Sequence, residues 1–223
     1  MAKRINPAQA GAWASLSHLY NNDPTTTSTH VLDAAQRAYE ADAFLSNAST
    51  IVERLFYAAY DLGQELDAAH WCTEGYRRFP GESAFTICQI YLMTMRGNEP
   101  QVDRAWQLAG SPAISAKGRV DFQKATARMW VAAVLARAGL KDSARAVARS
   151  AVANTDVDPA RLLYYFQAIA LNMLDDKPAA IQAIKTFLAA NPERRREFAD
   201  PNWYFRSLAG EQALRAIVGT SGR

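Results

Sequence analysis

The sequence lacks most of the features that mark export, membrane insertion or nucleic-acid binding. Among its 223 residues are two cysteines, too few for a disulfide framework and typical of proteins with reduced thiols. The net charge is only +3, without the dense basic stripe of a nucleic-acid-binding surface. The longest apolar run, near residues 129–135, is too short to span a membrane, and the N-terminus has no signal-like apolar segment. We therefore expect a cytoplasmic protein with no membrane span and no nucleic-acid partner.

Catalytic motifs are also missing. The sequence contains no Gly-rich phosphate loop, no H-E-x-x-H and no G-x-S-x-G. His70 and Cys72 form an H-x-C pair, but with Cys88 they make only three potential zinc ligands, so we interpret Cys72 as a core residue. His18 and His30 flank a threonine-rich loop without a recognisable nucleophile, which favours ordinary surface residues. We expect no enzyme activity, no metal and no cofactor.

Turn signals, in contrast, recur along the chain. Gly63, Gly97, Gly139 and Asp175 each follow an apolar stretch with helical periodicity, and they lie 34, 42 and 36 residues apart. A glycine just past a helix end adopts a left-handed backbone at little cost, and aspartate tolerates this region better than most residues. Strand-like alternation is nearly absent. The spacing predicts a series of antiparallel helix pairs.

Small residues recur at matched positions around these turns. Ala132 precedes Gly139, and Ala144, Ala148 and Ala151 follow it on one helical face. Because two helices approach closely only where their facing side chains are small, this pattern predicts tight packing within each pair. The corresponding second-helix positions in other units are Ala68, Cys72 and Gly75, then Val102, Trp106 and Ala109, then Ala180, Ile184 and Phe187.

These units resemble tetratricopeptide repeats. The family pattern has Trp-x2-Leu-Gly-x2-Tyr in the first helix, a turn, Ala-x3-Phe-x2-Ala in the second helix and a closing proline. Trp13, Leu16 and Tyr20 match the first-helix pattern, with Ser17 at the glycine position, and Pro192 closes the last unit. The resemblance implies an all-α fold, a right-handed α-solenoid of about five helix-turn-helix pairs with a C-terminal capping helix.

The predicted organisation has three parts. The first is an N-terminal tail over residues 1–12. The second is the solenoid over residues 13–192, with units at about 13–47, 49–81, 83–117, 118–157 and 158–192. The third is a capping helix and tail over residues 193–223, in which we expect a solvated Arg194–Arg196 run and Asp200 as N-cap before Pro201.

The resemblance also implies a ligand surface on the concave side, lined by the first helix of each pair. The residues predicted there are Glu53, Tyr57, Tyr60, Ile87, Tyr91, Met129, Tyr165, Ile169 and Asn172. Family members that clamp a peptide carboxylate use Lys, Asn and Arg on this face, types that are missing here except for Asn172. An apolar, tyrosine-rich groove suits an extended peptide or an amphipathic helix. The alternative is that Tyr91, Met129 and Ile169 simply fill the core between helices.

The sequence therefore predicts a non-catalytic interaction scaffold or adaptor whose partner is a protein or a peptide. Two alternatives stay open. One is a regulatory or sensor domain of a signalling protein, and the other is a structural subunit of a larger assembly. The sequence does not fix the oligomeric state.

Overall fold

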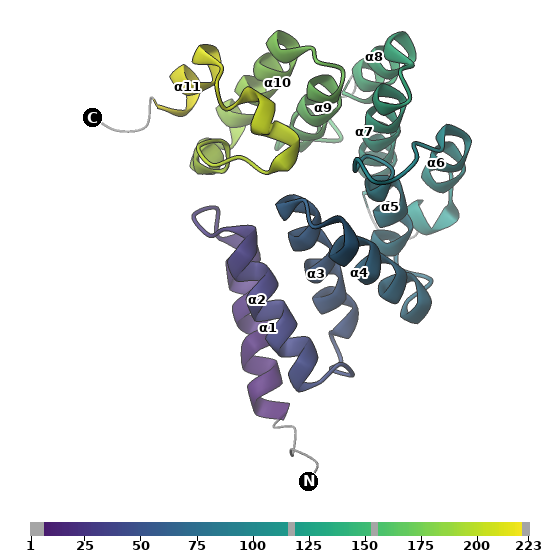
Figure 1. Cartoon of the computed structure of the whole chain (residues 1–223), viewed down its shortest axis with the longest axis vertical. Helices are drawn as coiled ribbons and strands as arrows, with labels where there is room; N and C mark the ends of the chain where they lie inside the picture. The colour runs from purple at the N-terminus through teal and green to yellow at the C-terminus, as the bar shows by residue number, and fades with distance from the viewer. Residues whose placement is uncertain (1–6, 116–118, 153–155, 220–223) are drawn as a thin grey trace. The chain divides into compact units, whose positions relative to one another are not determined.

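A computed structural model describes residues 7–115, 119–152 and 156–219. Within these ranges the secondary structure is helical, and no strand occurs (Figure 1). None of the described helices is both long and apolar enough to cross a membrane. The chain divides into two compact units between Phe85 and Thr86.

The first unit consists of successive helices that pack on their chain neighbours. They are α1 (Pro7–Asn22), α2 (Ser28–Ala41), α3 (Ala48–Leu62) and α4 (Glu65–Arg78). Helix α2 packs on both α1 and α3, and α3 also packs on α4. Ala14, Ala35, Ala38, Ile51 and Leu55 form a buried cluster among the first three helices. The early start of α1 makes residues 7–12 helical, within the segment expected to be a tail.

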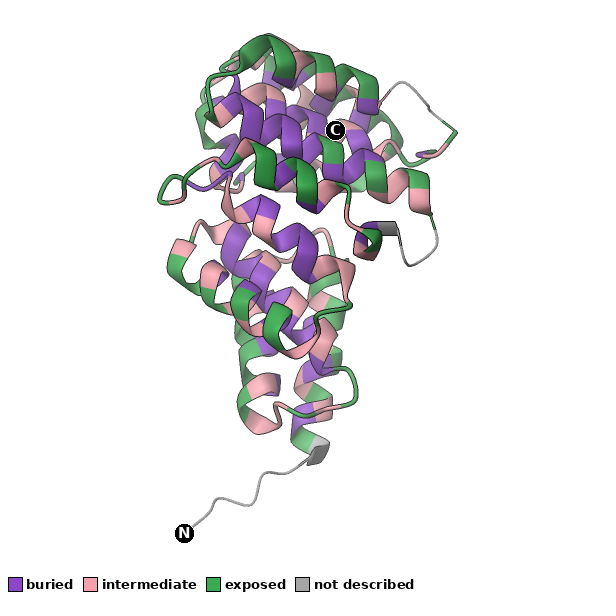
Figure 2. Cartoon of the chain, turned by 90° about the vertical axis from the view of Figure 1, so that its right-hand side faces the viewer, coloured by how far each residue is buried: buried purple, intermediate pink, exposed green. Residues whose placement is uncertain are grey.

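The second unit continues the same arrangement. After α5 (Ser83–Leu92), whose start lies in the first unit, come α6 (Val102–Ala109), η1 (Pro112–Ser115), α7 (Val120–Arg137), α8 (Lys141–Ala151), α9 (Leu162–Met173) and α10 (Lys177–Ala190). Helix α7 packs on α8 and α9, and α9 packs on α10. The prediction of an all-helical fold built from neighbouring pairs is confirmed. Buried and exposed positions alternate along the helices, as Figure 2 shows.

The small-residue faces lie in the core on α4, α8 and α10, as predicted. On α6 the prediction is wrong: Trp106 is 40% exposed, and the buried residues are Ala105 and Leu108. Ala132 and Ala144 are fully buried, Ala148 and Ala151 are at most 5% exposed, and their helices α7 and α8 pack together. Ala68 and Ala180 are likewise fully buried on α4 and α10. Larger side chains here would separate the paired helices, so the alanines permit the close approach.

Three of the four predicted turns have the expected backbone. The φ angle is 75° at Gly63, 78° at Gly139 and 59° at Asp175. Gly63 directly follows the end of α3 and its amide donates back to the helix, which is how a left-handed C-cap satisfies terminal carbonyls. At all three turns the residue type just past the helix end suits the backbone that the turn adopts.

Gly97 departs from the prediction because α5 already ends at Leu92. The chain then turns through residues 93–101 before α6, so Gly97 lies inside a turn and not at a helix end. The Thr94 hydroxyl donates to the Tyr91 carbonyl at 2.6 Å and helps to end the helix.

Arg137, at the end of α7, holds this turn in place. Its Nη1 donates to the carbonyl oxygens of Met93 and Asn98 at 2.8 Å, and also to that of Met95. Its Nη2 donates to the carbonyl of Arg96 at 3.3 Å. One guanidinium therefore satisfies carbonyls that a longer α5 would have bonded internally.

The C-terminal segment is not the single helix that we predicted. It forms η2 (Pro192–Phe198), η3 (Trp203–Leu208) and α11 (Gln212–Val218). Asn202, not Asp200, directly precedes η3, because buried Pro201 lies in the extended connection and not in the helix. Residues 220–223 of the expected tail lie outside the described ranges.

The cysteines are buried, at 2% exposure for Cys72 and 0% for Cys88, which agrees with a core position for Cys72. Neither is a free thiol in the structure, in contrast to the reduced cysteines that we expected.

We predict that Gly75→Ala destabilises the protein. A Cβ at this buried position on α4 would lie 2.1 Å from two ring carbons of Phe85, which is itself 1% exposed. Overpacking of this kind costs about 1–3 kcal/mol. In urea denaturation, Gly11→Ala is the matched control. Gly11 lies within α1, and a Cβ added there would have no neighbour within 4 Å, so alanine should stabilise the protein by up to about 1 kcal/mol. Equal effects of the two variants would contradict this packing.

We also predict that Arg137→Met lowers the free energy of unfolding by about 3 kcal/mol, because hydrogen bonds to charged groups contribute about 1.5–3 kcal/mol each. Arg137→Lys should recover only part of the loss, since an ammonium lacks the planar fork that reaches several carbonyls. Arg128→Met, at an exposed position of the same helix, should change stability by less than about 0.5 kcal/mol. A fully stable Arg137→Met would show that the turn does not need this contact.

Candidate functional site

The predicted groove residues all lie on helices expected to be the first of a pair. Glu53, Tyr57 and Tyr60 lie on α3, Ile87 and Tyr91 on α5, Met129 on α7, and Tyr165, Ile169 and Asn172 on α9.

Five of these side chains are buried and cannot meet a partner in this conformation. The exposed fraction is 1% for Tyr60, Met129 and Ile169, 6% for Tyr91 and 9% for Ile87. The Tyr91 ring lies 3.5 Å from that of Trp130 on α7, centroid to centroid. The alternative interpretation, that Tyr91, Met129 and Ile169 fill the core, therefore describes them better.

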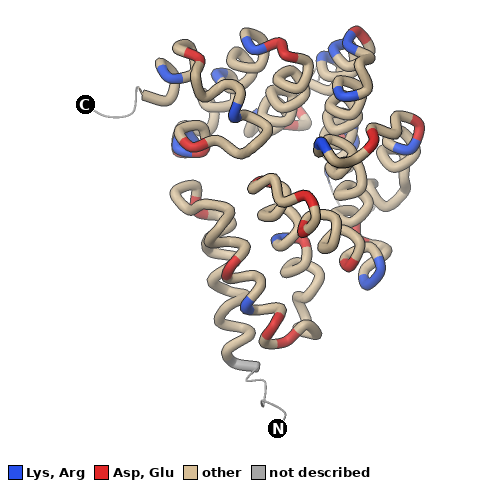
Figure 3. The backbone as a smooth tube through the Cα atoms, in the orientation of Figure 1, with Lys and Arg blue, Asp and Glu red and all other residues tan. Residues whose placement is uncertain are grey.

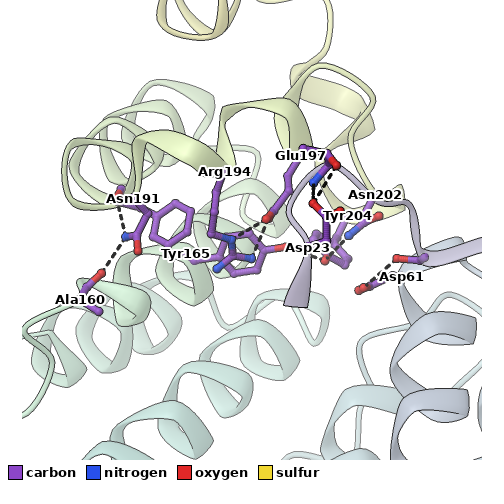
Figure 4. A network of polar contacts seen from close by, with 12 residues as sticks. Asp23, Asp61, Ala160, Tyr165, Asn191, Arg194, Glu197, Asn202 and Tyr204 are labelled. Carbon is purple, nitrogen blue, oxygen red and sulfur yellow. Dashed lines mark hydrogen bonds and ion pairs between the residues drawn. The ribbon is translucent and has the colours of Figure 1, made fainter. Parts of the chain in front are cut away.

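Glu53, Tyr57, Tyr165 and Asn172 are partly exposed. On α9, however, Tyr165 and Asn172 bind the C-terminal segment of the chain. The Tyr165 and Tyr204 hydroxyls are 2.8 Å apart, and the Asn172 side-chain amide donates to the Tyr204 carbonyl at 2.6 Å. The Tyr204 hydroxyl also accepts from the Asn202 amide at 2.8 Å (Figure 4). Part of the predicted groove is thus occupied by η3.

Aromatic rings extend this contact. The Tyr165 ring lies 5.5 Å from that of Phe205 and 5.3 Å from that of Phe187, each measured between centroids. Phe198 is 5.3 Å from Phe205. Phe187, Phe198 and Phe205 are at most 3% exposed, so α9, α10 and the C-terminal segment share one aromatic cluster.

Arg194 lies beside this cluster, contrary to the expected solvated arginine run. Its guanidinium is 4.9 Å from the centroid of the Phe187 ring and 5.3 Å from that of Tyr165. It donates to Glu197 at 2.5 and 2.7 Å. Burial acts to lower the pKa of Arg194, but the hydrogen bonds and charge of Glu197 outweigh it and raise the pKa. The Arg-x-x-Glu spacing is the sequence signal for this pair.

Arg54 is a second cation that the periodicity does not reveal. It lies on α3, is 9% exposed, and reaches α1. It donates to the Ala14 carbonyl at 3.1 Å, the Ser17 hydroxyl at 2.8 Å and the His18 Nδ1 at 3.0 Å. Burial lowers the pKa of Arg54, and these three acceptors compensate for the lost water. Ser17 therefore serves the α1–α3 contact.

The histidine and cysteine residues do not assemble into a site. Among the described residues, no three His, Cys, Asp or Glu side chains are placed to hold a metal ion. The exposed His70 ring lies edge-on to Trp71, 4.6 Å away between centroids.

We predict that Tyr204→Phe loosens the C-terminal segment, because the hydrogen bonds to Tyr165 and Asn202 are lost. The expected cost is about 1 kcal/mol, with faster amide hydrogen exchange in residues 192–208. Tyr76→Phe, which changes a tyrosine that is 47% exposed, should leave exchange there unchanged. Unaltered exchange in Tyr204→Phe would refute a role for the hydroxyl.

No family model, no curated protein and no solved structure matches the chain, so the tetratricopeptide resemblance stays a prediction from its own residues.

Proposed function

We propose that the chain is a non-catalytic scaffold or adaptor for protein–protein interaction, built as a right-handed solenoid of about five tetratricopeptide-like pairs. The observation that carries the proposal is the repetition of one packing rule. Ala68, Ala144 and Ala180 occupy the same position after three turns, and each is fully buried. A stack of such pairs presents a preorganised surface, so that binding a partner requires little ordering of the receptor.

The proposed contact site is the α3 part of the groove. Tyr57 is half-buried, with its ring 5.1 Å from that of Phe56, and Glu53 lies one helical turn before it. A tyrosine held in this way offers an apolar ring and a hydroxyl at low entropic cost, as is usual at interfaces. The α9 part has the same character but is covered by the C-terminal segment, so we assign the partner peptide or helix to α3.

Crosslinking mass spectrometry of the protein isolated from its native cell tests this site, because it identifies both the partner and the face. We expect crosslinks that cluster around α3. We also expect Tyr57→Ala to weaken binding of the identified partner at least tenfold, while the helical circular dichroism spectrum stays unchanged. Tyr76→Ala is the control at an exposed position. Unchanged affinity in Tyr57→Ala would reject the site. Tyr91→Ala is unsuitable as a binding probe, since Tyr91 is a core residue.

A structural subunit of a larger assembly is the second candidate, and it is favoured by exposed apolar side chains. In the first unit, Phe44 is 86% exposed, Leu66 is 87% exposed and Leu19 is 64% exposed. A neighbouring subunit that covered these side chains would bury apolar surface, which favours association. Light scattering separates the candidates: a mass that grows with concentration supports self-assembly, whereas a constant monomer mass supports the adaptor.

A further inference from the structure

The second unit contains a cavity of about 280 Å³ between α8, α9 and α10. Each helix contributes one face to it. Arg145 and Arg149 line it from α8, one turn apart, and Tyr164 and Leu171 line it from α9. Gln182 lines it from α10. None of these residues belongs to the groove proposed above.

One side of the cavity has balanced charge. The Arg145 guanidinium lies 3.7 Å from the Asp176 carboxylate and 3.5 Å from that of Asp142. Asp176 also accepts a hydrogen bond from the Ala179 amide, and so caps α10. Arg145 therefore has its counter-ions within the protein, and this part of the lining is unsuited to a further anion.

Arg149 differs from Arg145 in this respect. No Asp or Glu among the described residues lies within ion-pair distance of it. Arg145 and Arg149 are like charges at i and i+4 and repel each other weakly. Basic positions recur along α8, drawn blue in Figure 3. Arg149 is exposed to solvent, and an anion that enters the cavity reaches it without displacing an internal counter-ion.

The remaining lining supplies hydrogen-bond donors and an apolar wall. Tyr164 contributes a hydroxyl and Gln182 an amide, whereas Leu171, Ala179 and Ala183 are apolar. The Gln167 amide donates to the Ala148 carbonyl at 3.2 Å, which ties α9 to α8. The lining thus combines the Arg145–Asp176 pair, the exposed Arg149, two neutral donors and an apolar surface.

We propose that this cavity binds a carboxylate carried on a short apolar body, with Arg149 as the counter-ion and Tyr164 as a second donor. Guanidinium groups bind carboxylates through two parallel hydrogen bonds, and this geometry gives both strength and specificity. The volume is near the lower end of small-molecule sites, which span about 300–1,000 Å³. The occupant is therefore a small organic acid or a single acidic side chain of a peptide.

Nuclear magnetic resonance titration of the ¹⁵N-labelled full chain tests the proposal with three probes. These are glutarate, its neutral analogue glutaramide, and the peptide acetyl-Gly-Glu-Gly-amide. We expect glutarate or the peptide to shift amide signals of α8, α9 and α10 in a saturable manner, whereas glutaramide does not. Saturation by glutarate identifies a free acid as a sufficient ligand, and saturation by the peptide alone identifies an acidic side chain.

The matched variants are Arg149→Gln and Arg128→Gln, which remove the same charge from α8 and from an exposed position of α7. We expect Arg149→Gln to weaken binding at least tenfold and Arg128→Gln to leave it within twofold. The spectra themselves report whether each variant is folded. The proposal is overturned if neither acid saturates the signals, if glutaramide binds as well, or if the two variants weaken binding equally.

Discussion

The close contact between paired helices is the constraint on which the rest of the structure depends. Ala132, Ala144 and Ala148 leave no side chain large enough to hold α7 and α8 apart, and Gly75 on α4 leaves room only for the Phe85 ring. Such contacts gain dispersion energy across the whole helix face, while each alanine loses little side-chain entropy on burial. Bulky residues also fill the core: the Tyr91 ring packs against Trp130 of α7, so Tyr91 is buried although it belongs to a first helix.

The C-terminal segment uses the α9 surface in the way a bound peptide would. It contributes Tyr204 and Phe205 to an aromatic cluster and forms hydrogen bonds with Asn172, whereas the Arg194–Glu197 pair closes one side. This segment packs on α9 and α10 and covers apolar side chains of both helices. It does so with two short 3₁₀ segments and α11, and not with the single helix that we predicted.

Sequence reasoning was accurate where the determinants are local. A left-handed backbone follows the preceding helix end at Gly63, Gly139 and Asp175. The residue type and the apolar helical stretch before it are both visible in the sequence, so these turns could be predicted. The prediction for Gly97 was wrong because Arg137, which is distant in sequence, holds the turn that contains Gly97. The predicted groove residues were partly wrong for a related reason. Helical periodicity places Tyr91 and Tyr57 on similar helix faces, but it does not show which neighbouring helix covers each side chain. The Arg194–Glu197 spacing was readable, but its burial beside Tyr165 depends on the path of the whole segment.

The Arg54 contact has a consequence for how α1 attaches to α3. Two apolar helix faces can shift along each other at small cost, because one alanine or leucine replaces another in the contact. The Arg54 guanidinium has directional hydrogen bonds to the Ala14 carbonyl, the Ser17 hydroxyl and the His18 ring, and a shift would break them. Shifting α1 by a single turn, about 5.4 Å, would take the Ser17 hydroxyl and the His18 ring away from the guanidinium. Arg54 therefore adds a directional preference for one alignment to the apolar packing of Ala14.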